Sequence, residues 1–145
     1  MTRFSAIPTT PYAGCESVLP GYQFADAFKV PAPRGITAAE AMRLAFAHRP
    51  SWIRALMALR NRLGRLVGLT PAPASGFPVV RESPDEVVLG FDDKHLDFRV
   101  VVTVAGGFAT LTTVVRWHNA WGSAYLAAIM PFHRLIAARM LEGVA

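Results

Sequence analysis

The chain has 145 residues, enough for one domain, with 52% hydrophobic and 17% charged residues. These values predict a filled hydrophobic core and argue against general disorder. The formal net charge is +5, and Cys15 is the only cysteine, which excludes an intrachain disulfide and a cysteine-based zinc site. No apolar stretch is long enough to span a bilayer, and the first residues do not resemble a signal peptide. We therefore expect a cytoplasmic protein.

The first 18 residues are rich in proline and threonine, and we expect them to form an irregular segment ahead of one domain over residues 19–145. Residues 22–30 (YQFADAFKV) predict the first strand of that domain. Pro31, Pro33 and Gly35 then end it, because proline and glycine interrupt regular structure.

Two short helices are predicted between this strand and the rest of the sheet. Thr37 and Glu40 have the spacing of a capping box, which starts a helix that runs to about residue 48. Pro50 ends this helix, and Ser51 can cap a second helix over residues 51–67. Gly68 suits the position that follows its last turn.

Positive charge is concentrated in one part of the chain. Between Ala41 and Arg81 there are seven arginines and no acidic residue. Such a surface can meet nucleic acid, an anionic membrane or an acidic partner protein. A solvated helix face explains most charge runs, however, and the aromatic residues do not alternate with arginines as in a base-stacking platform. The sequence therefore disfavours nucleic-acid and membrane binding, and an interaction module through the arginine-rich helices 37–67 remains an alternative.

Four further strands follow, because the hydrophobic period changes to two. Residues 77–82 and 86–91 predict two strands joined by a turn at Ser83-Pro84-Asp85. Residues 95–104 and 108–118 predict two longer strands around Gly106-Gly107, a dipeptide typical of tight hairpins. The expected sheet thus has about five strands.

The Gly106-Gly107 turn also predicts the pairing of the two long strands. A two-residue turn places an almost wholly apolar set on one face, in the pairs Leu96–Trp117, Phe98–Val115, Val100–Thr113, Val102–Leu111 and Val104–Ala109. A shift by one residue would place apolar side chains opposite polar ones. We therefore expect this apolar face to pack against a helix.

The same pairing brings His95, Asp97, Arg116 and His118 together at one end of the other face. A cross-strand ion pair between Asp97 and Arg116, flanked by two histidines, is the favoured interpretation. A ligand-binding or acid–base site is the second, because a carboxylate can orient a histidine and raise its basicity. A metal site is the least favoured, because Arg116 would oppose a bound cation and the spacing matches no metal motif. No metal and no cofactor is expected.

The last predicted element is a helix from Asn119, which can cap it, to about Gly143. Pro131 lies inside this helix and predicts a kink or a break. Its apolar stripe is expected to contain Gly122, Tyr125, Ile129, Phe132, Ile136 and Met140. His133 lies beside this stripe and is interpreted as a packing residue.

Several short motifs are typical of one family. They are Leu19-Pro20-Gly21, Asp26-Ala27-Phe28, Phe46, Pro50-Ser51-Trp52, Leu59-Arg60-Asn61, Gly68-Leu69, Asp93-Lys94-His95-Leu96-Asp97-Phe98, His118-Asn119, Gly122, Tyr125 and Pro131-Phe132-His133-Arg134. Through them the chain resembles a bacterial family, domain of unknown function 2867, from residue 19 onward. That family is similar to START-like, polyketide-cyclase-like helix-grip domains. The resemblance implies an α+β fold in which a curved antiparallel sheet packs on a long C-terminal helix, often around a cavity for an apolar ligand. It implies no catalytic residues, because the family has no established activity.

The leading functional hypothesis is the binding of a small apolar molecule between the sheet and the C-terminal helix. Phe98, Trp117, Tyr125 and Phe132 are the expected contacts, because ligand pockets are lined mainly by apolar and aromatic side chains. An alternative is a cyclase- or isomerase-type enzyme that uses the cluster around Asp97 as acid or base. The apolar excess of the composition also leaves an oligomer open.

Overall fold

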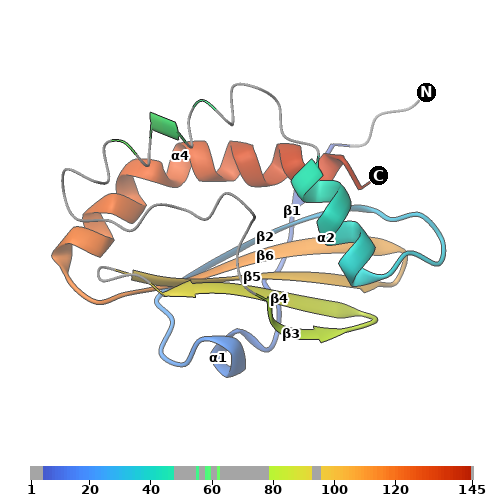
Figure 1. Cartoon of the computed structure of the whole chain (residues 1–145), viewed down its shortest axis with the longest axis horizontal. Coiled ribbons are helices and arrows are strands. Elements are labelled where there is room, and N and C mark those ends of the chain that lie inside the picture. The colour runs from blue at the N-terminus through green and yellow to red at the C-terminus, as the bar shows by residue number, and fades with distance from the viewer. Residues whose placement is uncertain are drawn as a thin grey trace.

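The structure, a computed structural model, describes residues 5–47, 55, 58–59, 62, 79–92 and 96–144. These residues form an α+β arrangement of strands and helices (Figure 1). In chain order the elements are β1 (Ile7–Pro8), α1 (Cys15–Val18), β2 (Phe24–Pro31), α2 (Ala38–Ala47), β3 (Val79–Ser83), β4 (Glu86–Asp92), β5 (Leu96–Ala105), β6 (Phe108–Trp117) and α4 (Ala120–Glu142).

The described strands form one curved, open, antiparallel sheet in the order β1-β2-β6-β5-β4-β3. Helix α4 packs against β2 and β6, and α2 packs against β4 and β5 and also touches α4. Figure 1 shows both helices on one side of the sheet and α1 on the other. We call these two sides the helix face and the α1 face.

The pairing predicted for the hairpin of β5 and β6 is confirmed at every described position. Leu96 pairs with Trp117, Asp97 with Arg116, and so on to the turn. Gly106 and Gly107 have φ angles of 60° and 82°, which glycine adopts more readily than any other residue. Because side chains alternate along a strand, the apolar set faces the helices, where most of its members join the hydrophobic core.

Helix α2 begins as the capping signal predicts. The Thr37 hydroxyl accepts a hydrogen bond from the backbone N–H of Glu40 at 3.2 Å. The buried side of this helix carries Ala38, Ala41, Met42 and Ala45, and the three small alanines let it lie close to the sheet. Of the predicted second helix, 51–67, positions 55, 58, 59 and 62 are helical and the remainder lies outside the described residues.

Helix α4 is capped by Asn119, whose side chain accepts a hydrogen bond from the Gly122 backbone N–H at 3.0 Å. The helix continues through Pro131, so the expected disturbance is a bend within one helix and no break (Figure 1). The predicted stripe is right at Gly122 and Met140 but wrong at Phe132, which is 52% exposed. The helix is apolar on more than one side, so periodicity alone does not define the face that packs on the sheet.

The N-terminal segment is more ordered than the sequence suggests. Strand β1 pairs Ile7 with Lys29 at the edge of the sheet, and α1 is a short helix on the α1 face. Cys15 and Leu19 from this segment are buried against Val114 of β6. Residues 7–8 and 15–18 thus form short regular elements within the segment 1–18 that the sequence predicts to be irregular. Pro8 is tolerated in β1 because β1 is an edge strand.

In the part of the chain that the structure describes, no helix combines the length and the apolar character needed to cross a bilayer.

Candidate functional site

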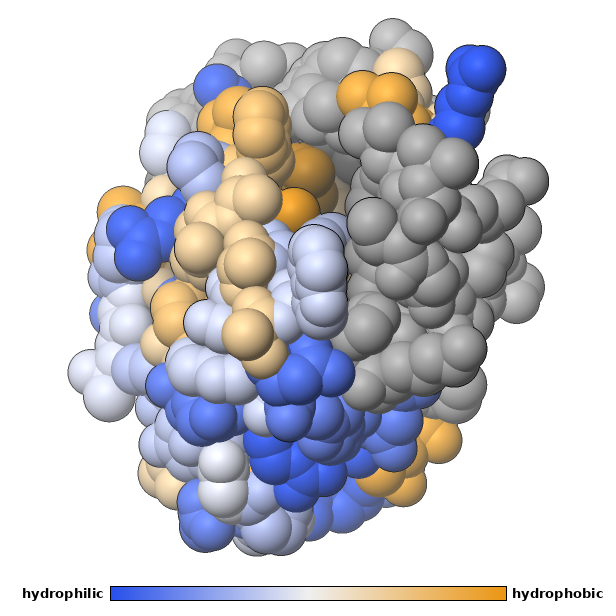
Figure 2. Space-filling view, turned by 90° about the vertical axis from the view of Figure 1, so that its left-hand side faces the viewer, coloured by the Kyte–Doolittle hydropathy of each residue, from blue (hydrophilic) through white to orange (hydrophobic). Residues whose placement is uncertain are grey.

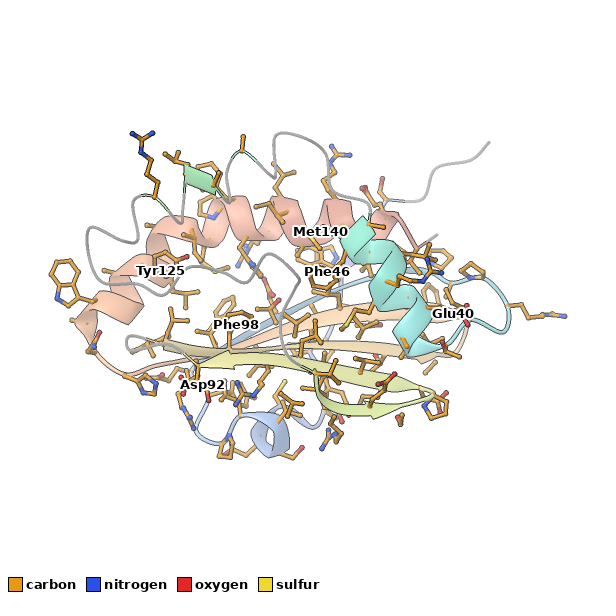
Figure 3. The ribbon with its side chains drawn as sticks, in the orientation of Figure 1. Glu40, Phe46, Asp92, Phe98, Tyr125 and Met140 are labelled. Atoms are coloured by element: carbon orange, nitrogen blue, oxygen red, sulfur yellow. The ribbon has the colours of Figure 1, made fainter. Side chains whose placement is uncertain are left out.

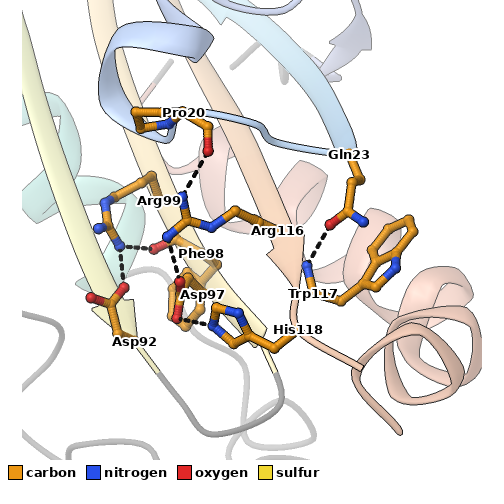
Figure 4. A network of polar contacts seen from close by, with 9 residues as sticks. All are labelled: Pro20, Gln23, Asp92, Asp97, Phe98, Arg99, Arg116, Trp117 and His118. Carbon is orange, nitrogen blue, oxygen red and sulfur yellow. Dashed lines mark hydrogen bonds and ion pairs between the residues drawn. The ribbon is translucent and has the colours of Figure 1, made fainter. Parts of the chain in front are cut away.

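The predicted polar cluster lies on the α1 face, at the end of the sheet where β5 begins. Arg116 Nη2 donates to Asp97 Oδ2 at 2.7 Å, and His118 Nε2 lies 2.9 Å from Asp97 Oδ1 (Figure 4). The Asp97 residue is only 4% exposed, whereas the His118 side chain is 41% exposed. His95, the fourth predicted member, lies outside the described residues.

Arg116 connects this cluster to the N-terminal part of the chain. Its Nη1 donates to the carbonyl oxygen of Pro20 at 2.7 Å, and nearby the Gln23 side chain accepts from the Trp117 backbone N–H at 2.8 Å (Figure 4). Burial alone would raise the pKa of Asp97, but the hydrogen bonds from Arg116 and His118 outweigh it and lower that pKa. These contacts fit the favoured interpretation, a cross-strand ion pair, and a catalytic role for the cluster stays a prediction.

A second polar group on the α1 face involves one of the seven arginines. Tyr12 donates its hydroxyl to Glu86 Oε2 at 2.6 Å, and Arg81 donates to Glu86 Oε1 at 2.6 Å. The guanidinium of Arg81 thus pairs within the chain. Arg43 and Arg62 are described as well, but the other four arginines of the basic segment lie outside the described residues, so the interaction-module hypothesis stays a prediction.

On the helix face, three of the four predicted ligand contacts lie together. Phe98, Trp117 and Tyr125 belong to one cluster, the aromatic cluster, which comprises Phe24, Leu96, Phe98, Val115, Trp117, Tyr125, Leu126 and Met130. Figure 3 shows Phe98 extending from the sheet beneath α4, on which Tyr125 lies. Phe132, the fourth predicted contact, is not part of the cluster, because it lies on an exposed side of α4.

The aromatic cluster differs from the main core in how well it is covered. The main core, which includes Val30, Ala41, Val102, Leu111 and Leu141, lies between α2, α4 and the other end of the sheet, and most of its residues are buried. In the aromatic cluster only Leu96, Val115 and Leu126 are buried, and the aromatic side chains are half-buried. Figure 2, which views the molecule from this end, shows hydrophobic side chains gathered in its upper half and hydrophilic ones below.

A buried polar pair lies next to this cluster, and the sequence did not single it out. Asp26 of β2 points to the helix face, and its Oδ1 lies 3.5 Å from Nε2 of His133 on α4. Thr113 of β6 pairs with Asp26 across the strands. Both carboxylate oxygens, the His133 Nε2 and the Thr113 hydroxyl are buried, and none has a hydrogen-bond partner among the described residues. We call these three residues the polar triad.

On β2, β6 and α4 alike, the residue of the polar triad lies between residues of the aromatic cluster and residues of the main core. Along β2 it lies between Phe24 of the aromatic cluster and Phe28 of the main core. Along α4, His133 lies between Met130 of the aromatic cluster and Ile136 of the main core. An unpaired buried polar atom costs about 1–3 kcal/mol, so three such groups in one place are unfavourable for stability alone.

The sequence did contain a partial signal for this triad. Asp26 has the same strand parity as Phe24 and Phe28, which places a carboxylate on an otherwise apolar face. His133 was interpreted as a packing residue, and it does lie on the inner side of α4. No local sequence pattern predicts that Asp26 and His133 lie side by side, because more than 100 residues separate them in the chain.

A shallow depression of about 440 Å³ lies near the hairpin turn, where Ala32, Arg34, Val104 and Gly107 are among the residues that line it, and it includes no predicted site residue. Across the described ranges, no three His, Cys, Asp or Glu side chains converge as metal ligands would.

Comparison with known proteins places the chain in a family. No curated protein and no solved structure matches it. The family model described as "Protein of unknown function (DUF2867)" matches residues 18–140, which is most of the chain and includes β2, the hairpin and nearly all of α4. The chain therefore belongs to the DUF2867 family of proteins of unknown function.

Proposed function

We propose that this protein binds a small apolar molecule between the sheet and α4, in contact with the aromatic cluster. The observation that carries the proposal is the incomplete burial of Phe24, Phe98, Trp117 and Tyr125, which come from both layers and gather at one end. Half-buried aromatic side chains around a few polar groups are the usual lining of a small-molecule site. Burying them against a ligand would remove apolar surface from water, which is favourable at about 25 cal/mol for each Å².

The arrangement of the layers supports a START-like, helix-grip interpretation of the fold. In such folds a curved antiparallel sheet holds a long C-terminal helix, and the ligand lies between them. Here α4 crosses the helix face over β2 and β6, and the aromatic cluster fills part of the space at the end where α4 begins. Among the described residues, the sheet has five strands besides the two-residue β1, fewer than a full helix-grip sheet, so the proposed site is small.

A space-filling substitution tests the proposal. Leu126 is buried in the aromatic cluster, whereas Leu135 of the same helix is 46% exposed. If a ligand enters the cluster, Leu126→Trp occupies its place and weakens the binding of the neutral probe N-phenylnaphthylamine by about tenfold or more. Leu135→Trp is the matched control and retains native affinity. Probe fluorescence gives the dissociation constants, and circular dichroism reports whether each variant is folded.

Met130→Trp serves as a second variant if the change at Leu126 prevents folding, because Met130 is half-buried in the same cluster. The proposal is wrong if the native protein binds the probe without saturation. It is also wrong if a folded variant at Leu126 or Met130 binds the probe as tightly as the Leu135 control does.

A further inference from the structure

We propose that Asp26 and His133 are the polar anchor of this site, and that its ligand is a neutral apolar molecule with a hydroxyl group, such as an alcohol or a phenol. This inference rests on the proposed function and adds the chemical class of the ligand. Its basis is the polar triad, whose hydrogen-bonding atoms are buried beneath α4 at the inner edge of the aromatic cluster.

Asp97 is a buried carboxylate with a structural role, and its hydrogen-bond partners can be compared with those of Asp26. Each Asp97 oxygen has its own partner, at 2.7 Å from Arg116 and 2.9 Å from His118. The two carboxylate oxygens of Asp26 are also buried, but Oδ1 lies 3.5 Å from His133 Nε2, and neither oxygen accepts a hydrogen bond from a described residue. The two acceptors of Asp26 are therefore available to a donor that enters from the aromatic cluster.

The position of the triad matches that role. Phe24 and Val115 are the next residues on the helix face along β2 and β6, and both belong to the aromatic cluster. Met130 is the cluster residue nearest to His133 along α4. An apolar molecule among the aromatic side chains would thus bring one end against Asp26, and its other end would lie toward Trp117 and the start of α4.

The hydrogen-bonding atoms of the triad favour some polar groups of a ligand over others. A hydroxyl group donates one hydrogen bond to Asp26 and accepts another from the His133 N–H or the Thr113 hydroxyl, so it satisfies both sides of the triad. A carboxylate would place a second negative charge beside Asp26. An ammonium group can donate to Asp26 but accepts no hydrogen bond, so it would leave the His133 N–H unpaired. An ether or a hydrocarbon would leave Asp26 without a donor.

Three probes of similar shape separate the hydroxyl, ether and carboxylate cases: naphthol, methoxynaphthalene and naphthoate. We expect the native protein to bind naphthol at least about tenfold more tightly than the other two, because a hydrogen bond to a buried charged group is worth that much. Isothermal titration calorimetry at neutral pH provides the dissociation constants. The probe series varies the polar group and keeps the ring system, so apolar contacts with the aromatic cluster are nearly constant.

Variants of Asp26 test whether the preference comes from the anchor. In Asp26→Leu the preference for naphthol over methoxynaphthalene falls to about parity, and in Asp26→Asn it is reduced, because an amide accepts more weakly than a carboxylate. Asp92→Asn is the matched control, since this carboxylate is 64% exposed and pairs with Arg99 on β5. It keeps the native preference.

The outcomes distinguish the two proposals. Saturable binding of all three probes without a preference for naphthol overturns the anchor and its ligand class, but leaves the apolar site intact. A naphthol preference that persists in folded Asp26→Leu also overturns the anchor. Absence of saturable binding for every probe overturns the proposed function and the anchor with it.

Discussion

Arg116 holds two parts of the chain with one guanidinium group, because it donates to Asp97 on β5 and to the carbonyl oxygen of Pro20 after α1, each at 2.7 Å. Arg116→Ala removes both contacts and leaves the buried Asp97 with His118 alone. Since the Arg116 side chain is one-third exposed, we expect a loss of about 2 kcal/mol in the free energy of unfolding, less than for a fully buried pair. Urea denaturation of the variant and the native protein measures this loss.

Arg139→Ala is the matched control for that change. Arg139 lies 3.6 Å from Glu142 on α4 and its side chain is 56% exposed, so we expect a loss below about 0.5 kcal/mol. Equal losses in the two variants would contradict a stabilising role for the Arg116 contacts.

Asp97 makes the stability of the fold depend on pH, and the direction of its pKa shift gives the sign of that dependence. Its pKa is lowered in the folded state, because the hydrogen bonds from Arg116 and His118 outweigh the effect of burial. The carboxylate therefore stabilises the fold above its ordinary pKa of about 3.9, and this contribution is lost as the pH falls through the folded-state pKa. The melting temperature of Asp97→Asn should be below that of the native protein at neutral pH, and the difference should shrink on acidification. A constant difference from neutral to acidic pH would contradict this account.

Tyr12 ties the N-terminal segment to β4 through its hydroxyl group. Tyr12→Phe removes the 2.6 Å hydrogen bond to Glu86 but keeps the ring, so we expect a loss of about 1 kcal/mol in the free energy of unfolding. The control is Tyr22→Phe, at a side chain that is exposed, and its effect should be smaller. Chemical denaturation of both variants measures the difference, and a larger effect at Tyr22 would refute the prediction.

The hairpin turn depends on glycine at one position in particular. Gly107 has a φ of 82°, and alanine there should cost about 1–2 kcal/mol, because a side chain in this region approaches its own backbone. Gly143, at the end of α4, has a φ of −66°, and Gly143→Ala should be neutral or slightly stabilising. Thermal unfolding compares the two variants. A larger loss at Gly143 would show that backbone conformation is not the cause.

The hairpin could be predicted in full because its information is local. Gly106-Gly107 sets the turn, and the alternation on either side sets the pairing from Leu96 to Trp117, so turn chemistry and face matching give the same answer. The ion pair of Asp97 with Arg116 follows from that pairing. The predicted contacts Phe98, Trp117 and Tyr125 also came together, because two of them lie on the apolar face of the hairpin.

The rest of the site depends on how distant elements meet. Helix α4 has apolar residues around more than one side, including the exposed Phe132 and Leu135, so its inner face is decided by packing against β2 and β6. Asp26 and His133 lie at opposite ends of the sequence, and their approach is visible only once α4 crosses the sheet. Sequence periodicity describes each element separately and cannot give such a pair.

A titration with naphthol followed by two-dimensional NMR tests whether an apolar molecule binds between the sheet and α4. We expect saturable shift changes in side chains of both layers of the aromatic cluster, Phe98 and Val115 from the sheet and Leu126 from α4, together with the backbone of Asp26. Changes confined to the depression beside Gly107, or changes that never saturate, would contradict the claim.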